Sequence, residues 1–184
     1  MYIKRHLEKN IEKYLFKGKI IIVYGARQVG KTVLAKSILK KYADEDCYFN
    51  CEILSTKQAL EQQDPLKLKN FLGNGRVVVL DEAQKVSNIG LALKLLIDTY
   101  PNMQIIAAGS SSFDLSNQVN EPLTGRALEF TLFPFSLSEL SDVHSSQEMN
   151  AVLEKSLVYG MYPEVVSSDI NDARVYLNNL SSKY

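Results

Sequence analysis

The chain has 184 residues, of which 46% are hydrophobic and 23% charged, the balance of a globular domain with at most a small subdomain. Its 21 basic and 21 acidic residues cancel to a formal net charge of zero, which excludes the overall basic character of a dedicated nucleic-acid binder. The apolar runs are too short to cross a bilayer and the charged amino terminus lacks the apolar core of a secretory signal, so we expect a cytoplasmic protein with no membrane partner.

Helix and strand patterns alternate along residues 1–135. In chain order they predict a helix at 4–16, a strand at 19–24, a helix at 31–43, a strand at 47–53, a helix at 64–75, a strand from 76, a helix at 89–101, a strand from 103 and a strand at 127–134. The runs that begin at 76 and 103 are continuously apolar, which is typical of strands covered on both faces. This alternation predicts an α/β domain with a parallel sheet.

The carboxyl-terminal part has a different character. From about Ser136 no further run of the buried-strand type occurs, and the pattern predicts a helical appendage. We therefore expect a main domain at 1–135 and a smaller helical part at 136–184.

Two further predictions concern buried side chains. The residues expected to face inward from the helix at 31–43 are Val33, Leu34, Ile38 and Leu39. The two cysteines, Cys47 and Cys51, are too few for a disulfide framework and lack the partners of a zinc site. We expect them to be buried thiols on one face of the second strand.

Between the first strand and the next helix the chain reads GARQVGKT, which fits the phosphate-loop pattern G-x-x-x-x-G-K-[ST]. In such a loop the glycines let successive N–H groups face phosphate oxygens, and the helix that follows presents its positive end. Lys31 would reach the terminal phosphates and Thr32 would ligate Mg²⁺. The alternative is a chance glycine turn, but the strand before and the helix after favour the phosphate loop. The candidate ligand-binding residues are Gly25, Ala26, Arg27, Gln28, Val29, Gly30, Lys31, Thr32 and Val33.

An acidic pair, Asp81 and Glu82, ends the apolar run RVVVL. Ligands of parallel sheets bind at the carboxyl ends of the strands, so Asp81 can hold the water shell of a Mg²⁺ ion. Glu82 can polarise a water that attacks the terminal phosphate. The alternative is that both acids only cap the helix that follows; combined with the phosphate loop, the catalytic interpretation is favoured.

Ser110 follows the apolar run IIAAG. If that strand lies between the strands that carry the phosphate loop and the acidic pair, its polar end touches the terminal phosphate and the attacking water. Ser111 or Ser112 could take this part instead, and an ordinary serine-rich turn is the structural alternative.

Arg126 ends the segment LTGR directly before the fifth predicted strand. An arginine supplied to a nucleotide site stabilises the charge that builds on the transferred phosphoryl group, an effect of roughly 10³ to 10⁵ in rate where it is established. Taken alone, an arginine after a glycine is also an ordinary surface residue.

The ordered combination of these segments resembles the AAA-type ATPases, specifically a prokaryotic family in which GxRQVGKT, VxxLDEAQ, GSSS and L-x-GR occur in this order, followed by FPFSLSEL and GMYPEVV. The resemblance covers nearly the whole chain from about Ile3. Longer members of that family continue into a second domain, so this chain resembles the ATPase half alone, either a piece of a longer protein or a short relative.

The resemblance implies a P-loop NTPase fold of AAA type, with a five-stranded parallel sheet in the order 5-1-4-3-2 at 1–135 and a helical lid at 136–184. ATP and Mg²⁺ are the implied cofactors. Lys31 and Thr32 become phosphate and magnesium ligands, Asp81 the Walker B acid and Glu82 the catalytic glutamate. The implied sensor is Ser110, and Arg126 lies where an arginine finger would reach the neighbouring subunit of a homo-oligomer.

Two parts of the family pattern are ambiguous in this chain. GMYP, at 160–163, resembles the Gly-x-x-Pro turn by which a helical lid approaches the adenine, but Gly160 and Pro163 could equally just break two helices. Relatives tend to carry an acid where this chain has Cys51 beside Glu52, and Arg174 is the only candidate for a second sensor in the lid.

The leading hypothesis is a Mg²⁺-dependent ATPase that drives movement of itself or of an unidentified protein or nucleic-acid partner. A non-hydrolysing ATP switch and a small-molecule kinase on the same phosphate loop are the alternatives.

Overall fold

The computed structural model describes residues 3–42, 45–110, 119 and 121–181, and the chain divides into two compact units. The first, which we call the sheet unit, takes its described residues from 7–26 and 31–132. The second, which we call the helical unit, takes them from 3–6, 27–30 and 133–181.

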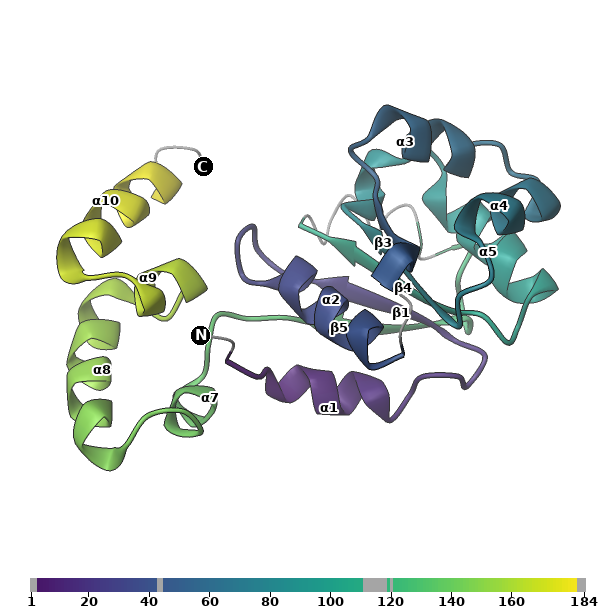
Figure 1. Cartoon of the computed structure of the whole chain (residues 1–184). Coiled ribbons are helices and arrows are strands. Elements are labelled where there is room, and N and C mark those ends of the chain that lie inside the picture. The colour runs from purple at the N-terminus through teal and green to yellow at the C-terminus, as the bar shows by residue number, and fades with distance from the viewer. Residues whose placement is uncertain (1–2, 43–44, 111–118, 120, 182–184) are drawn as a thin grey trace. The chain divides into compact units, whose positions relative to one another are not determined.

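The sheet unit is built on five parallel strands (Figure 1). They are β1 (Ile20–Tyr24), β2 (Tyr48–Asn50), β3 (Val77–Asp81), β4 (Gln104–Gly109) and β5 (Ala127–Thr131). Their order in the sheet is β2-β3-β4-β1-β5, which confirms the predicted five-stranded sheet and its strand order. The prediction that the fourth strand lies between the first and the third is confirmed as well.

Among the residues that the structure describes, five α-helices and two 3₁₀ turns accompany the sheet. They are α1 (His6–Glu12), α2 (Lys31–Lys41), η1 (Glu45–Cys47), α3 (Leu54–Leu60), α4 (Pro65–Leu72), η2 (Ala83–Lys85) and α5 (Ile89–Thr99). The sequence did not predict α3. Asp64 starts α4 by accepting hydrogen bonds from the backbone N–H groups of Leu66 and Lys67, and Gly73 ends it with a φ of 76°.

Both faces of the sheet are covered. Every residue of β1, β3 and β4 is buried. One face packs its alternate side chains, such as Ile22 and Leu80, into a core with Leu68 of α4 and Leu93 of α5. On the other face of the sheet, α2 packs against β3 and β4. This double cover explains why these strands are continuous apolar runs in the sequence.

Two predictions about burial need correction. Val33 is 54% exposed, because it sits on the outer side of the first turn of α2, while Leu34, Ile38 and Leu39 are buried as expected. The cysteines do not share a strand face: β2 has only three residues, Cys47 belongs to η1 and Cys51 follows the strand. Cys51 is buried and Cys47 is half-buried.

The helical unit contains four helices in its described residues after 136. They are α7 (Leu137–Ser141), α8 (Ser146–Tyr159), α9 (Pro163–Ser167) and α10 (Ile170–Ser181). Ser136 and Ser145 each begin a helix with a capping box, paired with Glu139 and Glu148. A small apolar cluster of Ile3, Phe135 and Leu140 forms its core. The domain boundary between 135 and 136 remains a prediction.

Across the described part of the chain, no helix has both the length and the apolar character needed to cross a membrane.

Candidate functional site

The segment between β1 and α2 has the backbone of a tight loop. Of its two glycines, Gly30 needs its freedom, since its φ of 102° lies where residues with a side chain rarely go. Gln28 also has a positive φ, 62°. The ammonium of Lys31 is buried and donates hydrogen bonds of 2.9 Å to the carbonyl oxygens of Gly25 and Ala26. The lysine therefore lies against the loop at the carboxyl end of β1.

The remaining predicted loop residues differ in exposure. Arg27 and Gln28 are exposed, whereas Val29 is fully buried. Thr32 is half-buried at the start of α2, and its neighbour Val33 is open to solvent. These exposures leave Arg27, Gln28 and Val33 accessible to a ligand.

Asp81 accepts two hydroxyl hydrogen bonds at the carboxyl end of β3. The hydroxyl of Thr32 donates to its Oδ2 over 2.5 Å and the phenol of Tyr48, on β2, donates to the same oxygen over 2.7 Å. The carboxylate is only 3% exposed. Burial and the hydrogen bond to Asp81 raise the pKa of Tyr48, so the phenol stays a donor. The structure thus brings the two predicted metal ligands together.

Glu82 and Ser110 meet through their side chains. Ser110, just beyond β4, donates a 3.1 Å hydrogen bond to Oε2 of Glu82. The amide of Gln84 donates to the same carboxylate oxygen over 2.5 Å and to the Ser110 hydroxyl over 3.1 Å. Glu82 has a left-handed backbone with φ 52° and ψ 41°. A residue with a side chain adopts this backbone conformation only at an energetic cost, and residues strained in this way are often found at functional sites.

The alternative role of the acidic pair, capping the next helix, has no support in the geometry. The helix α5 begins at Ile89, and its cap residue is Asn88, which makes no side-chain capping hydrogen bond. Glu82 precedes only the 3₁₀ turn η2 and does not cap it through its side chain. The pair is therefore available for other chemistry.

Cys51 lies beside the two carboxylates. Burial raises the pKa of its thiol to about 12, and the charges of Asp81 and Glu82 add to the effect. The thiol thus stays protonated at neutral pH and reports on the negative field of this part of the sheet.

Arg126 lies at the opposite end of the sheet from these residues. It directly precedes β5, whose first residue pairs with Ile20 at the start of β1, whereas the loop follows the end of β1. The length of β1 separates the two ends by about 16 Å. Its Nε donates a 2.7 Å hydrogen bond to Oδ1 of Asp98, at the surface, and this pair lowers the pKa of Asp98.

The remaining predicted residues are in the helical unit or outside the described residues. Gly160 ends α8 with a φ of 76° and Pro163 begins α9, so both do break helices. Arg174 is exposed on α10. Ser111 and Ser112, the alternatives to Ser110, lie outside the described residues.

Two residues of this arrangement carried no prediction. Gln84 was considered only as the last residue of the DEAQ segment, and Tyr48 only as part of the strand predicted at 47–53. Because β2 pairs with β3 so that Asn50 lies opposite Asp81, Tyr48 comes within reach of that carboxylate. A polar residue two positions after Glu82 was the only available signal for Gln84.

Thr32 and Asp81 fit a magnesium ion. A hydroxyl and a carboxylate are hard oxygen ligands, and Mg²⁺ usually takes one or two of these from the protein, with water and phosphate oxygens completing its octahedron. In the residues that the structure describes, no group of three or more His, Cys, Asp or Glu side chains forms a metal cage. The donor set therefore suits a shared metal–phosphate site.

A parallel sheet of this strand order, with a G-x-x-x-x-G-K-[ST] loop between its first strand and the following helix, defines the P-loop class of proteins. A family model described as an AAA domain matches residues 17–141. Since this match covers more than half of the chain, the protein belongs to that family.

Sequence relatives agree with this placement. The chain is 27% identical to the uncharacterized protein MJ1544 of Methanocaldococcus jannaschii over 177 residues, which are 89% of this chain and 40% of that protein. It is 28% identical to the uncharacterized protein Mb2031c of Mycobacterium bovis over 125 residues, 67% of this chain and 27% of that protein. The chain spans less than half the length of both relatives.

Solved structures share the fold. The Walker-type ATPase PABY2304 of Pyrococcus abyssi superposes with a TM-score of 0.63 at 18% identity, over 98% of this chain and 72% of that one. A structure on katanin self-assembly gives a TM-score of 0.53 at 15% identity, over 100% and 71%. At such identities the likeness is one of fold.

The environment of Cys51 predicts selective thiol labelling. At pH 8 a thiol of pKa about 12 is ionised to only about one part in 10⁴, so Cys51 should react with Ellman's reagent at least about 100-fold more slowly than the half-buried Cys47. The reaction is followed by absorbance on the folded protein and again in denaturant. Cys47→Ser should leave only the slow phase, and raising the pH from 7 to 8, where the protein stays folded, should accelerate it about tenfold because the thiolate fraction rises about tenfold per pH unit below the pKa. A Cys51 that reacts equally fast in folded and unfolded protein would contradict this geometry.

Proposed function

We propose that the chain binds ATP with Mg²⁺ and hydrolyses it to ADP and phosphate, driving a conformational change in itself or in a partner. The observation that carries this proposal is the gathering of Lys31, the Thr32–Asp81 pair and the Glu82–Ser110 pair at the carboxyl ends of β1, β3 and β4. Membership of the AAA-domain family supports it.

The loop would bind the phosphates. Residues 25–33 would offer backbone N–H groups and the positive end of α2 to the β- and γ-phosphates. Lys31 would turn its ammonium from the carbonyls of Gly25 and Ala26 to phosphate oxygens. Its buried position makes this charge count for more than it would in water.

Thr32 and Asp81 would hold the magnesium ion. When bound, the ion would neutralise charge on the β- and γ-phosphates. Thr32 would give up its hydrogen bond to Asp81 and offer its hydroxyl oxygen as a ligand, while Asp81 would accept hydrogen bonds from metal-bound water. Tyr48 would continue to hold Oδ2 of Asp81 in place.

Glu82 would act on the attacking water. The water oxygen forms a bond to the γ-phosphorus as the bond to the β–γ bridging oxygen breaks, and Glu82 takes up the proton that the water loses. Ser110 and Gln84 fix the orientation of this carboxylate through Oε2, which leaves Oε1 to meet the water. Ser110 would also touch the γ-phosphate, in the role of a sensor.

Arg126 would serve the site of a second copy of the chain. About 16 Å separates it from the loop of its own sheet, so a finger role requires a homo-oligomer in which this end of the sheet meets a neighbour's nucleotide. The surface pair with Asp98 is weak enough to exchange for a phosphate partner.

The work that hydrolysis performs would depend on partners, which the fold does not specify. We propose a nucleotide-binding domain at 1–135, a helical lid at 136–184, an unidentified protein or nucleic-acid partner and a cytoplasmic location. A non-hydrolysing switch or a small-molecule kinase would leave the held carboxylate of Glu82 without a task.

Substitutions at Lys31 and Glu82 should separate binding from turnover. Lys31→Ala should weaken ATP binding at least tenfold and abolish phosphate release, whereas Glu82→Gln should keep ATP binding and lower release at least about 100-fold, because a general base contributes 10²–10⁴. Phosphate release with Mg²⁺ and equilibrium ATP binding are measured side by side.

Lys40→Ala, an exposed lysine on the same helix, is the matched control for Lys31 and should change neither quantity. If the wild-type protein binds ATP but releases no phosphate, hydrolysis is contradicted and the non-hydrolysing switch is favoured. Release only with a phosphate acceptor present would indicate a kinase.

Arg126 should make turnover depend on concentration. We expect activity per chain to rise with protein concentration, and Arg126→Ala to lower the plateau at least about 100-fold while leaving ATP affinity unchanged. Arg76→Ala is a matched control, because Arg76 also is exposed and directly precedes a strand at the same end of the sheet. A flat concentration dependence together with a fully active Arg126→Ala protein would remove the finger assignment.

A further inference from the structure

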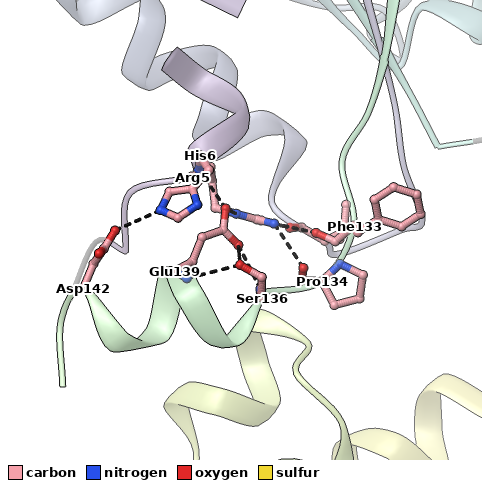
Figure 2. A network of polar contacts seen from close by, with 8 residues as sticks. Arg5, His6, Phe133, Pro134, Ser136, Glu139 and Asp142 are labelled. Atoms are coloured by element: carbon pink, nitrogen blue, oxygen red, sulfur yellow. Dashed lines mark hydrogen bonds and ion pairs between the residues drawn. The ribbon is translucent and has the colours of Figure 1, made fainter. Parts of the chain in front are cut away.

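The guanidinium of Arg5 is buried in the helical unit and uses its donors in several directions (Figure 2). Its side chain is only 6% exposed, and its Nε donates to Oε1 of Glu139 over 3.0 Å. Nη1 donates to the carbonyl oxygen of Val29 over 3.0 Å, and Nη2 to those of Phe133 and Pro134 over 2.5 and 3.3 Å. One arginine thus joins the amino-terminal segment, the loop and the segment before α7.

Glu139 is held as firmly as Arg5. It accepts hydrogen bonds from the backbone N–H groups of His6, over 2.8 Å, and Ser136, over 2.9 Å. Burial by itself raises the pKa of Glu139, but these bonds and the Arg5 guanidinium outweigh it and lower the pKa below its ordinary value. The carboxylate therefore stays charged at neutral pH and neutralises Arg5.

This neutralised pair is a poor candidate for a stabilising device. Removing two charges from water carries a large desolvation cost, and replacing such pairs by apolar residues is often neutral or stabilising. Because Glu139 neutralises Arg5, the guanidinium also exerts little electrostatic attraction on a bound anion. The property of Arg5 that neutralisation does not remove is the planar, fixed geometry of its guanidinium donors, which is suited to orienting backbone carbonyl groups.

The contact with Val29 determines how one peptide of the loop is turned. The carbonyl of Val29 and the N–H of Gly30 belong to a single trans peptide plane, so they point in opposite directions. Holding the carbonyl towards Arg5 therefore directs the N–H of Gly30 away from Arg5. An added Cβ at Gly30 would lie 3.6 Å from Nη1, so the guanidinium also packs against this residue.

We propose that Arg5 is a positioning residue of the phosphate loop: it fixes the Val29–Gly30 peptide so that the Gly30 N–H is directed to a phosphate oxygen. This inference rests on the proposed function for its ligand, ATP. The orientation of the peptide in the protein without nucleotide does not depend on that function. Arg5 acts through the backbone of Val29 and does not touch the phosphates.

The test compares two variants that treat the pair differently. The double variant Arg5→Met/Glu139→Gln removes both charges at similar volume, so that no unpaired buried charge is left, and deletes the donor to Val29. The single variant Glu139→Gln keeps that donor and an amide oxygen that can accept from Nε of Arg5, but it leaves the guanidinium without a counter-charge, so it is compared only when its unfolding transition is intact. Arg5→Ala alone leaves Glu139 without its cation and is not informative if it fails to fold.

Two readouts are taken on each protein with an intact unfolding transition. Binding of a fluorescent ATP analogue with Mg²⁺ should weaken about tenfold in the double variant, the loss expected for one charge-assisted hydrogen bond, and stay within about twofold in Glu139→Gln. Amide hydrogen exchange of the peptide 25–33 without nucleotide should accelerate in the double variant only. The peptide that contains β3 serves as internal control.

Arg5→Lys separates orientation from charge. Lysine keeps the positive charge but lacks the guanidinium fork, so it should bind the analogue as weakly as the double variant. Restored binding in Arg5→Lys, or equal effects of the double variant and Glu139→Gln, would overturn the positioning role. If the wild type binds no ATP while exchange of the loop still depends on Arg5, the proposed function fails and the orientation of the loop stands.

Discussion

The parallel pairing of β1 with β4, and of β4 with β3, is the constraint on which the site depends. Because all strands run the same way, the residues that follow them reach the same edge of the sheet. Lys31, Asp81 and Ser110 are thus gathered from three segments far apart in the chain. In β1, β3 and β4 the residues between the two ends of each strand are all apolar, so the polar residues of these three strands lie only at their ends.

Hydroxyl and amide donors hold the carboxylates at that edge. Asp81 is nearly buried yet keeps two donors on one oxygen, from Thr32 and Tyr48, and Glu82 is held by Ser110 and Gln84. A buried carboxylate without such partners would be costly. The same donors set the orientation of each acid. In the proposed function this orientation would prepare Asp81 for a metal ion and Glu82 for water.

Sequence analysis predicted those features of the fold and the site that patterns within short stretches of the chain encode. The apolar runs and the strand–loop–helix context of GARQVGKT gave the sheet and the loop, while the strand order came from the family resemblance. The pattern could not place Val33, whose helix face depends on which turns of α2 the sheet covers, nor Tyr48, whose partner Asp81 is reached only through strand pairing. Arg5 was missed altogether, because Glu139 lies 134 positions further along the chain and no periodicity links them.

The most direct test of the account is a crystal structure of Glu82→Gln with ATP and Mg²⁺. The account predicts triphosphate oxygens on the backbone N–H groups of the loop and on Lys31, a magnesium ion ligated by the Thr32 hydroxyl with Asp81 in its water shell, and a water between residue 82 and the γ-phosphorus. A nucleotide bound elsewhere on the molecule, or a crystal grown at saturating ATP with no nucleotide on the loop, would contradict it.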